Sequence, residues 1–172
     1  MKKLIYMTAL LLVSIMSLTS CGDDEPKEKT TVRATYSMSF SQDLLKACNV
    51  IITYKAENGR NVIQPISSDS PTWTKAVTSD KFPAEFGVYY QFSPLADGEL
   101  TQEKYDLSCN LQFSMVTSKG ASYTNNYTII DNKGVSRDKV VAYLKGQSNK
   151  SKGFRVTENG VVSEATNLKY DD

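Results

Sequence analysis

The stretch YDLSCNLQFSM, residues 105–115, indicates the fold most directly. Apolar side chains occupy every odd position from Tyr105 to Met115, and polar side chains occupy the even positions between them. Successive residues of a β-strand point to opposite faces of a sheet, so this alternation predicts a strand with one buried face and one wet face. Residues 31–40 alternate in the same way, with apolar side chains at the even positions.

Turn signals divide the rest of the chain into further strands. Asn58-Gly59 and Asn159-Gly160 supply the positive φ angles of tight hairpin turns, and residues 118–120 form another turn between two apolar stretches. Eight or nine short strands in one domain predict a mainly β protein, an antiparallel β-sandwich of loosely immunoglobulin-like architecture. The expected strands are residues 31–40, 49–57, 62–66, 72–78, 85–93, 105–117, 122–130, 153–157 and 161–166.

Two segments interrupt the strand pattern. Residues 136–147, SRDKVVAYLKGQ, predict one short helix, with Ser136 placed to accept a bond from a first-turn amide. Its narrow apolar stripe favours packing over an open end or edge of a sheet, with binding of a partner helix as the alternative. Residues 41–47 predict a single helical turn. Residues 131–134, DNKG, lack the alternating carboxylates of a calcium loop and are interpreted as a turn.

Two cysteines fall on inward-facing positions of separate strands. Cys48 shares its parity with Val50 and Ile52, and Cys109 lies on the apolar face of residues 105–115. In an exported protein this placement favours a disulfide that closes a loop of about 60 residues, worth on the order of 4 kcal/mol. The alternative is two buried free thiols that act as small hydrophobes. The immunoglobulin motif itself is absent, since Trp73 lies far beyond Cys48 in the sequence.

The N-terminus carries an export signal. Lys2 and Lys3 precede an uncharged apolar stretch, residues 4–18, which is shorter than the roughly 20 residues of a membrane-spanning helix. This pattern is typical of a signal peptide, residues 1–20. Leu18-Thr19-Ser20-Cys21 resembles the lipobox of bacterial lipoproteins. The resemblance implies that the chain is cut before Cys21 and lipidated on it, which would attach the protein to a membrane.

Residues 21–30 are expected to be a flexible acidic tether that precedes a single domain, residues 31–172. Asp23, Asp24 and Glu25 resemble the surface-export signal of Bacteroidota lipoproteins, which implies an outer-membrane protein facing the cell surface; a periplasmic orientation is the alternative. The runs DLLKACNVIITYKAENG and KFPAEFGVYY also resemble small, uncharacterised lipoproteins of the Bacteroidota. That resemblance supports fold and location and implies no mechanism.

Composition excludes several function classes. The chain has 172 residues and no histidine, which rules out a histidine-based triad or an imidazole metal site. A formal charge of +1 argues against a nucleic-acid binder. The sequence shows no phosphate-binding glycine loop and no CxxC pair, so no cofactor is expected. Its carboxylates have no diagnostic spacing, and we expect no enzyme.

Exposed aromatic residues are the usual platforms of glycan-binding modules. Trp73 and Tyr89 are the candidates here, with the alternative that Trp73 belongs to the core. The sequence thus favours a non-catalytic envelope lipoprotein that binds a glycan or a protein. The alternatives are an assembly accessory of an envelope complex or surface fibre and, less favoured, a carboxylate-dependent hydrolase.

Overall fold

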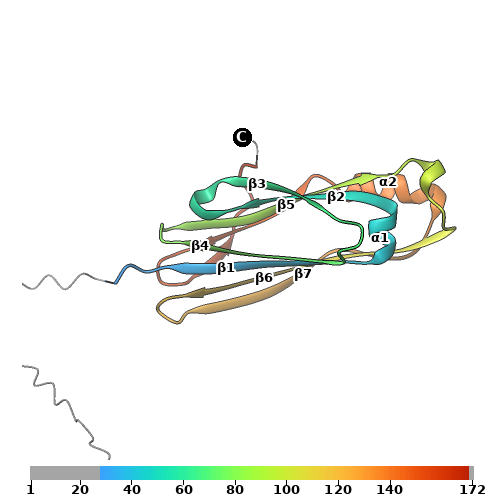
Figure 1. Cartoon of the computed structure of the whole chain (residues 1–172). Helices are drawn as coiled ribbons and strands as arrows, with labels where there is room; N and C mark the ends of the chain where they lie inside the picture. Colours follow the sequence, from blue (N-terminus) through green and yellow to red (C-terminus); the bar gives the residue numbers. More distant parts are fainter. Residues whose placement is uncertain (1–27, 171–172) are drawn as a thin grey trace, which may run out of the picture.

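The fold is taken from a computed structural model, in which residues 28–170 are described. Two antiparallel sheets pack face to face as a β-sandwich (Figure 1). Sheet A has the strand order β4-β1-β6-β7, and sheet B has the order β3-β2-β5-β8-β9. The predicted mainly β sandwich is therefore confirmed. The strands are β1 (Val32–Phe40), β2 (Cys48–Lys55), β3 (Asn61–Ile66), β4 (Thr72–Ser79), β5 (Ala84–Pro94), β6 (Lys104–Thr117), β7 (Ser122–Ser136), β8 (Lys150–Val156) and β9 (Val162–Glu164).

The core lies between the inner faces of the two sheets. Apolar and polar residues alternate along β6, so the apolar residues all point into this core. Tyr105, Phe113 and the other odd-numbered residues of β6 up to Met115 are buried, as the sequence predicts. The Phe113 ring stacks on Phe154 of β8 with ring centroids 3.9 Å apart, which joins sheet A to sheet B. Removing this one-sided apolar surface from water is the main force that holds the sheets together.

Short helical segments close one end of the sandwich. The predicted helical turn is α1 (Gln42–Ala47), where the Ser41 hydroxyl accepts a hydrogen bond from the Leu44 amide. The predicted helix is α2 (Arg137–Gln147), which buries Val140 and Leu144. Two 3₁₀ turns, η1 (Glu57–Gly59) and η2 (Asp97–Glu99), complete the structure.

Two local expectations near α2 were wrong. Residues 131–134 continue β7 instead of forming a turn. The strand contains one extra residue between the partners of Tyr105 and Leu107, and this bulge is accommodated by Gly134, which adopts a φ of 65° and whose amide donates to Asp106 Oδ1 at 2.8 Å. The Ser136 side chain does not cap the helix amides. It bonds instead to Asp138, which lowers the pKa of that carboxyl.

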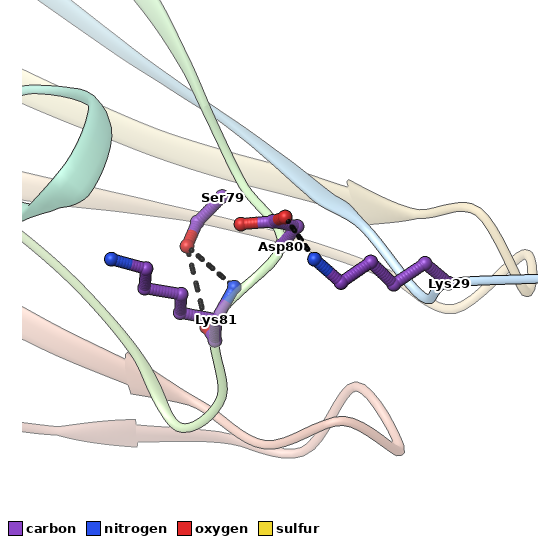
Figure 2. Close-up of polar contacts among 4 residues, drawn as sticks. All are labelled: Lys29, Ser79, Asp80 and Lys81. Carbon is purple, nitrogen blue, oxygen red and sulfur yellow. Dashed lines mark hydrogen bonds and ion pairs between the residues drawn. The ribbon is translucent and has the colours of Figure 1, made fainter.

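The chain enters the domain at the end opposite α1 and α2 (Figure 1). There Lys29 Nζ lies 2.7 Å from Asp80 Oδ2, in the turn that follows β4 (Figure 2). Ser79 Oγ, beside them, accepts a hydrogen bond from the Lys81 amide at 3.2 Å. The Thr30 hydroxyl donates to Glu158 Oε1 at 2.9 Å. These contacts, made by residues at the start of the described chain, define an entry pole.

Candidate functional site

The outer edge of β7 is the least protected strand edge in the part of the chain that the structure describes. Within that part β7 pairs only with β6, so no strand covers its other side, although the Asn126 amide in this stretch donates to Asn125 Oδ1 at 2.9 Å. From Ser122 to Ile130 the sequence SYTNNYTII contains no charge and no proline. Side chains of this kind leave an edge open to pairing with another strand.

The three other sheet edges carry features that discourage strand addition. β3 contains Pro65, which has no amide hydrogen, and β9 has only three residues. On β4, Lys75 pairs in register with the buried Tyr36 and so occupies an inward position, with its Nζ 5.8 Å from the Tyr54 ring centroid. An inward-pointing charge on an edge strand is a known barrier to edge-to-edge association. Asn125 holds the corresponding inward position on β7, opposite Phe113.

Aromatic side chains support the open half of β7 from within. Tyr123 and Tyr127 are half-buried on its inner side, and their hydroxyls lie 3.4 Å apart. Lys152 Nζ of β8 lies 4.8 Å from the centroid of the Tyr127 ring. The edge is thus held in an extended, ordered shape, which would lower the entropic cost of adding a strand.

The part of the outer face of sheet A next to this edge consists mostly of uncharged polar residues, with two apolar residues, Ala76 and Val116. The register places the residues of this part in rows across the sheet, for example Thr74, Ser37, Gln112 and Asn126. In the part of this face beside Ser122–Thr128, Arg33 is the single charged residue, whereas Lys104, Asp106 and Asp131 are charged residues further along β6 and β7. This part comprises Arg33, Thr35, Ser37, Ser39, Thr72, Thr74, Ala76, Thr78, Asn110, Gln112, Ser114, Val116, Ser122, Thr124, Asn126 and Thr128.

A shallow recess of about 330 Å³ lies on this face. Six residues with hydroxyl or amide groups line it together with Met38 and Leu111, and two hydrogen bonds involve these polar side chains. Ser37 Oγ lies 3.0 Å from Thr74 Oγ1, and Gln112 Nε2 donates to Asn126 Oδ1 at 3.0 Å. The recess can offer donors and acceptors to a neutral hydroxylated ligand, and Ser37, Ser39, Thr72 and Asn126 are among the side chains around it.

The two candidate aromatic residues do not form a joint platform. Trp73 is only 7% exposed and packs in the core, its ring stacked on Tyr36 with centroids 6.4 Å apart. The prediction that Trp73 is an exposed platform is therefore wrong, and the alternative, a core residue, describes it. Tyr89 lies on the outer face of sheet B, where Tyr170 stacks on it at 5.7 Å. A stacking site for a sugar that uses both rings is thus not present.

Cys48 and Cys109 are both buried and both free, so the expected disulfide is not formed in this structure. Cys48 Sγ donates instead to the Leu44 carbonyl oxygen at 3.3 Å, which ties the thiol to α1. Burial raises the pKa of Cys48 to about 12 and raises that of Cys109 still further. The structure thus contains the alternative arrangement, two buried thiols in the apolar core.

Ionised carboxyls with shifted pKa values lie in surface pairs. Hydrogen bonding to Lys29 lowers the pKa of Asp80, and hydrogen bonds from Thr30 and Lys119 lower that of Glu158. A catalytic acid needs the opposite shift. Among residues 28–170 no group of three or more His, Cys, Asp or Glu side chains could hold a metal ion. No helix in that range has the length and apolar character needed to cross a membrane.

Comparisons with known proteins found no matching family model, no matching curated protein and no matching solved structure. The expected lipidation at Cys21, the signal peptide and most of the tether lie outside the described residues. The open edge of β7 was missed at the sequence level. Its charge-free stretch was visible there, but which strands lie at the edges depends on pairing between distant segments.

Proposed function

We propose that this protein is a non-catalytic envelope lipoprotein that binds a protein partner by strand addition along β7. The observation that carries the proposal is the contrast among the four sheet edges within residues 28–170. β3 contains a proline, β4 an inward lysine and β9 only three residues, whereas the Ser122–Ile130 part of β7 has none of these features. Strand addition to such an edge is one way in which an assembly accessory of an envelope complex or surface fibre would bind its partner. The lipobox-like Leu18-Thr19-Ser20-Cys21 supports the membrane attachment.

The location of the open edge fits a partner in the same envelope. Ser122 follows the β6–β7 turn, where the Ser118 amide donates to the Thr31 carbonyl oxygen at 2.9 Å, beside the entry pole. If Cys21 is lipidated, this pole lies nearest the membrane, and residues 21–30 set the distance to it. A second protein held at the same membrane would then be within reach of β7.

Site-specific photo-crosslinking in native cells tests this function. A photoreactive residue at position 125 of the full chain should give one discrete protein adduct, because Asn125 lies on the open edge. The matched control carries the same residue at position 75, on the protected edge of β4. Adducts of equal yield at both positions, or no adduct at position 125, would reject strand addition.

A substitution then separates edge pairing from general disturbance of the surface. Asn125→Lys copies onto β7 the inward lysine that β4 has at Lys75, and it should abolish the adduct formed from a photoreactive residue at position 123. Thr124→Lys adds the same charge to the outer face and should leave that adduct at half its yield or more. Labelling intact cells with a membrane-impermeant reagent tests exposure at the cell surface; an unlabelled protein would indicate the periplasmic orientation.

The recess on sheet A supports a second candidate function, the binding of a neutral glycan. Its carrying observation is the uncharged lining of the recess, which consists of hydroxyl- and amide-bearing residues together with Met38 and Leu111. A glycan array should then report binding to uncharged oligosaccharides, lost with Gln112→Lys in the recess and kept with Ile63→Lys on β3, which is exposed on the other sheet. An array without binding would leave the protein partner as the remaining function.

A further inference from the structure

A second recess, of about 300 Å³, lies at the side of the sandwich where the edge strands β3 and β4 come together. The end of β3, the connecting loop and the start of β4 line it, so one continuous piece of chain builds the site. None of its lining residues is charged. We call it the edge recess, and its polar residues are Gln64, Ser67, Ser70, Thr72, Trp73 and Thr74.

Trp73 presents an unused hydrogen-bond donor to the edge recess. Its side chain is only 7% exposed, with the ring stacked on Tyr36 and tilted against Tyr54 at a centroid distance of 5.4 Å. No group in residues 28–170 accepts a hydrogen bond from the indole N–H, and this N–H is nevertheless accessible to solvent. A tryptophan buried to this extent usually donates to the protein. The small exposed part of Trp73 therefore leaves a donor for a ligand in the recess that it lines.

The backbone of β4 adds further donors and acceptors to the edge recess. The Phe40 amide donates to the Pro71 carbonyl oxygen at 2.8 Å, and hydrogen-bonded pairs recur at every second residue of an antiparallel ladder. Trp73 is thus bonded to β1, whereas Thr72 and Thr74 direct their amide and carbonyl groups to the open side of β4. Because both threonines line the recess, a ligand there can bond to the backbone as well as to hydroxyl groups.

The loop that closes the edge recess is held by its own hydrogen bonds. The Ser70 amide donates to the Ser67 carbonyl oxygen at 3.0 Å, and the Asp69 amide donates to Ser67 Oγ at 3.3 Å. The recess is therefore formed before a ligand binds, which lowers the entropic cost of binding.

The edge recess adjoins the recess on the outer face of sheet A. Thr72 lines both of them, and the hydrogen bond between Ser37 Oγ and Thr74 Oγ1 joins their linings a second time. Charged residues make up 23% of the chain, yet neither lining contains one. Two adjoining recesses with hydroxyl, amide and indole groups but no charge fit a ligand that carries many hydroxyl groups and no charge.

We propose that one linear, uncharged oligosaccharide binds across Thr72, with one part in the sheet A recess and the next part in the edge recess, where the Trp73 N–H donates to one of its oxygens. This inference rests on the neutral-glycan function proposed above and adds a second subsite and a minimum length of ligand. Trp73 then acts through its N–H and not through the face of its ring. Contacts in the second recess become intramolecular once the first is filled, so a sugar chain that spans both should bind more tightly than a short one.

The indole N–H signal in the NMR spectrum of the full chain, in detergent, tests the contact directly, because Trp73 is the single tryptophan of the sequence. Maltotetraose, cellotetraose and mannotetraose are the probes. At least one should shift this signal and bind at least tenfold more tightly than its disaccharide. A tetrasaccharide that binds without moving the indole signal would overturn the inference.

Two lysine substitutions in one loop separate the edge recess from general disturbance of the surface. Ser70→Lys places a long, charged side chain in the recess and should lower the affinity for the tetrasaccharide at least tenfold. Ser68→Lys adds the same charge outside the lining and should leave the affinity within twofold. Both serines are exposed, so both variants should fold. Equal losses in the two variants would reject the edge recess as a subsite.

Gln112→Lys in the sheet A recess distinguishes this inference from the function on which it rests. Binding that is lost with Gln112→Lys and reduced with Ser70→Lys would support a ligand that spans both recesses. Binding that is lost with Gln112→Lys and unchanged with Ser70→Lys would keep the sheet A recess as a glycan site and overturn its extension. A chain that binds none of the tetrasaccharides would overturn both.

Discussion

The outer faces of the two sheets differ in what lies on them. On sheet B the chain's own residues 165–170 sit over Gly87 and Gly153, so side-chain volume is restricted there. On sheet A the outward Thr, Ser, Asn and Gln side chains are exposed or half-exposed to solvent. The two outward faces of the sandwich are therefore under different constraints. On sheet B packing limits the size of a side chain, and on sheet A contact with water favours polar side chains.

The largest expected effect comes from adding the same side chain to both faces. Gly153→Val should lower the free energy of unfolding by about 3 kcal/mol, because its side chain would overlap Leu168 and the Ala165 carbonyl oxygen. Ser114→Val, on the outer face of sheet A, should change it by less than about 0.5 kcal/mol. Urea unfolding measures both, and equal losses would remove the distinction between the faces.

The next largest effect is expected from Tyr36, a core residue of sheet A whose hydroxyl is hydrogen-bonded to the backbone of sheet B. Tyr36 of β1 is fully buried, and its hydroxyl accepts from the Gly87 amide at 2.8 Å and donates to the Lys55 carbonyl oxygen at 3.3 Å. Tyr36→Phe leaves that buried amide without its acceptor, which should cost about 2 kcal/mol. The control is Tyr143→Phe on α2, which is half-exposed. If both substitutions lower the free energy of unfolding equally in urea, the Tyr36 hydroxyl does not stabilise β5 at Gly87.

Local pattern was sufficient to predict the sandwich but not the two surfaces. The alternation in residues 105–115 predicted the inner face of β6, because one-sided burial leaves a period of two in the sequence. Gly87 and Gly153 gave no comparable signal, since their closeness arises from pairing between strands far apart in the chain. The segment from Ala165 was predicted to be a strand up to residue 166, yet β9 ends at Glu164 and the chain then crosses the sheet.

The site predictions failed where two arrangements satisfied the same pattern. An inward position for Cys48 and Cys109 suits a disulfide and suits two thiols, and the pattern contains no distance between the residues. Trp73 lies between two threonines on β4, and this pattern does not show which face of the strand is buried. The register, in which Trp73 pairs with the buried Met38, places its side chain in the core. Only the packing of the two sheets distinguishes these cases.

The thiols beneath the two faces give a smaller, pH-dependent effect. Cys109 belongs to sheet A and Cys48 to sheet B, and burial raises the pKa of Cys48 from 9.0 to about 12. The unfolded chain therefore loses thiol protons at lower pH than the folded chain. The thiol's contribution to the free energy of unfolding should therefore be constant well below pH 9, and this free energy should fall as pH rises from 9 towards 12, less steeply in Cys48→Ala.

Alkylation followed by peptide mass measurement examines the same pair. At pH 8 the folded protein should leave Cys48 and Cys109 unmodified, and after unfolding without reductant both should be alkylated, since the thiolate is the reactive form. Thiols that stay unmodified after unfolding, and react only once a reductant is added, would establish the disulfide in place of the free pair.

The smallest effect is expected at the entry pole, which belongs to neither face. Lys29 and Asp80 are 2.7 Å apart, but their side chains are 77% and 43% exposed, so solvent screens their attraction (Figure 2). Lys29 lowers the pKa of Asp80, and the contribution to stability is therefore present at neutral pH and is lost as pH falls through that lowered value. Asp80→Asn should leave the Tm at pH 7 unchanged within error in differential scanning calorimetry. A clear drop would mean that the entry pole, and not only the covered face of sheet B, restrains the fold.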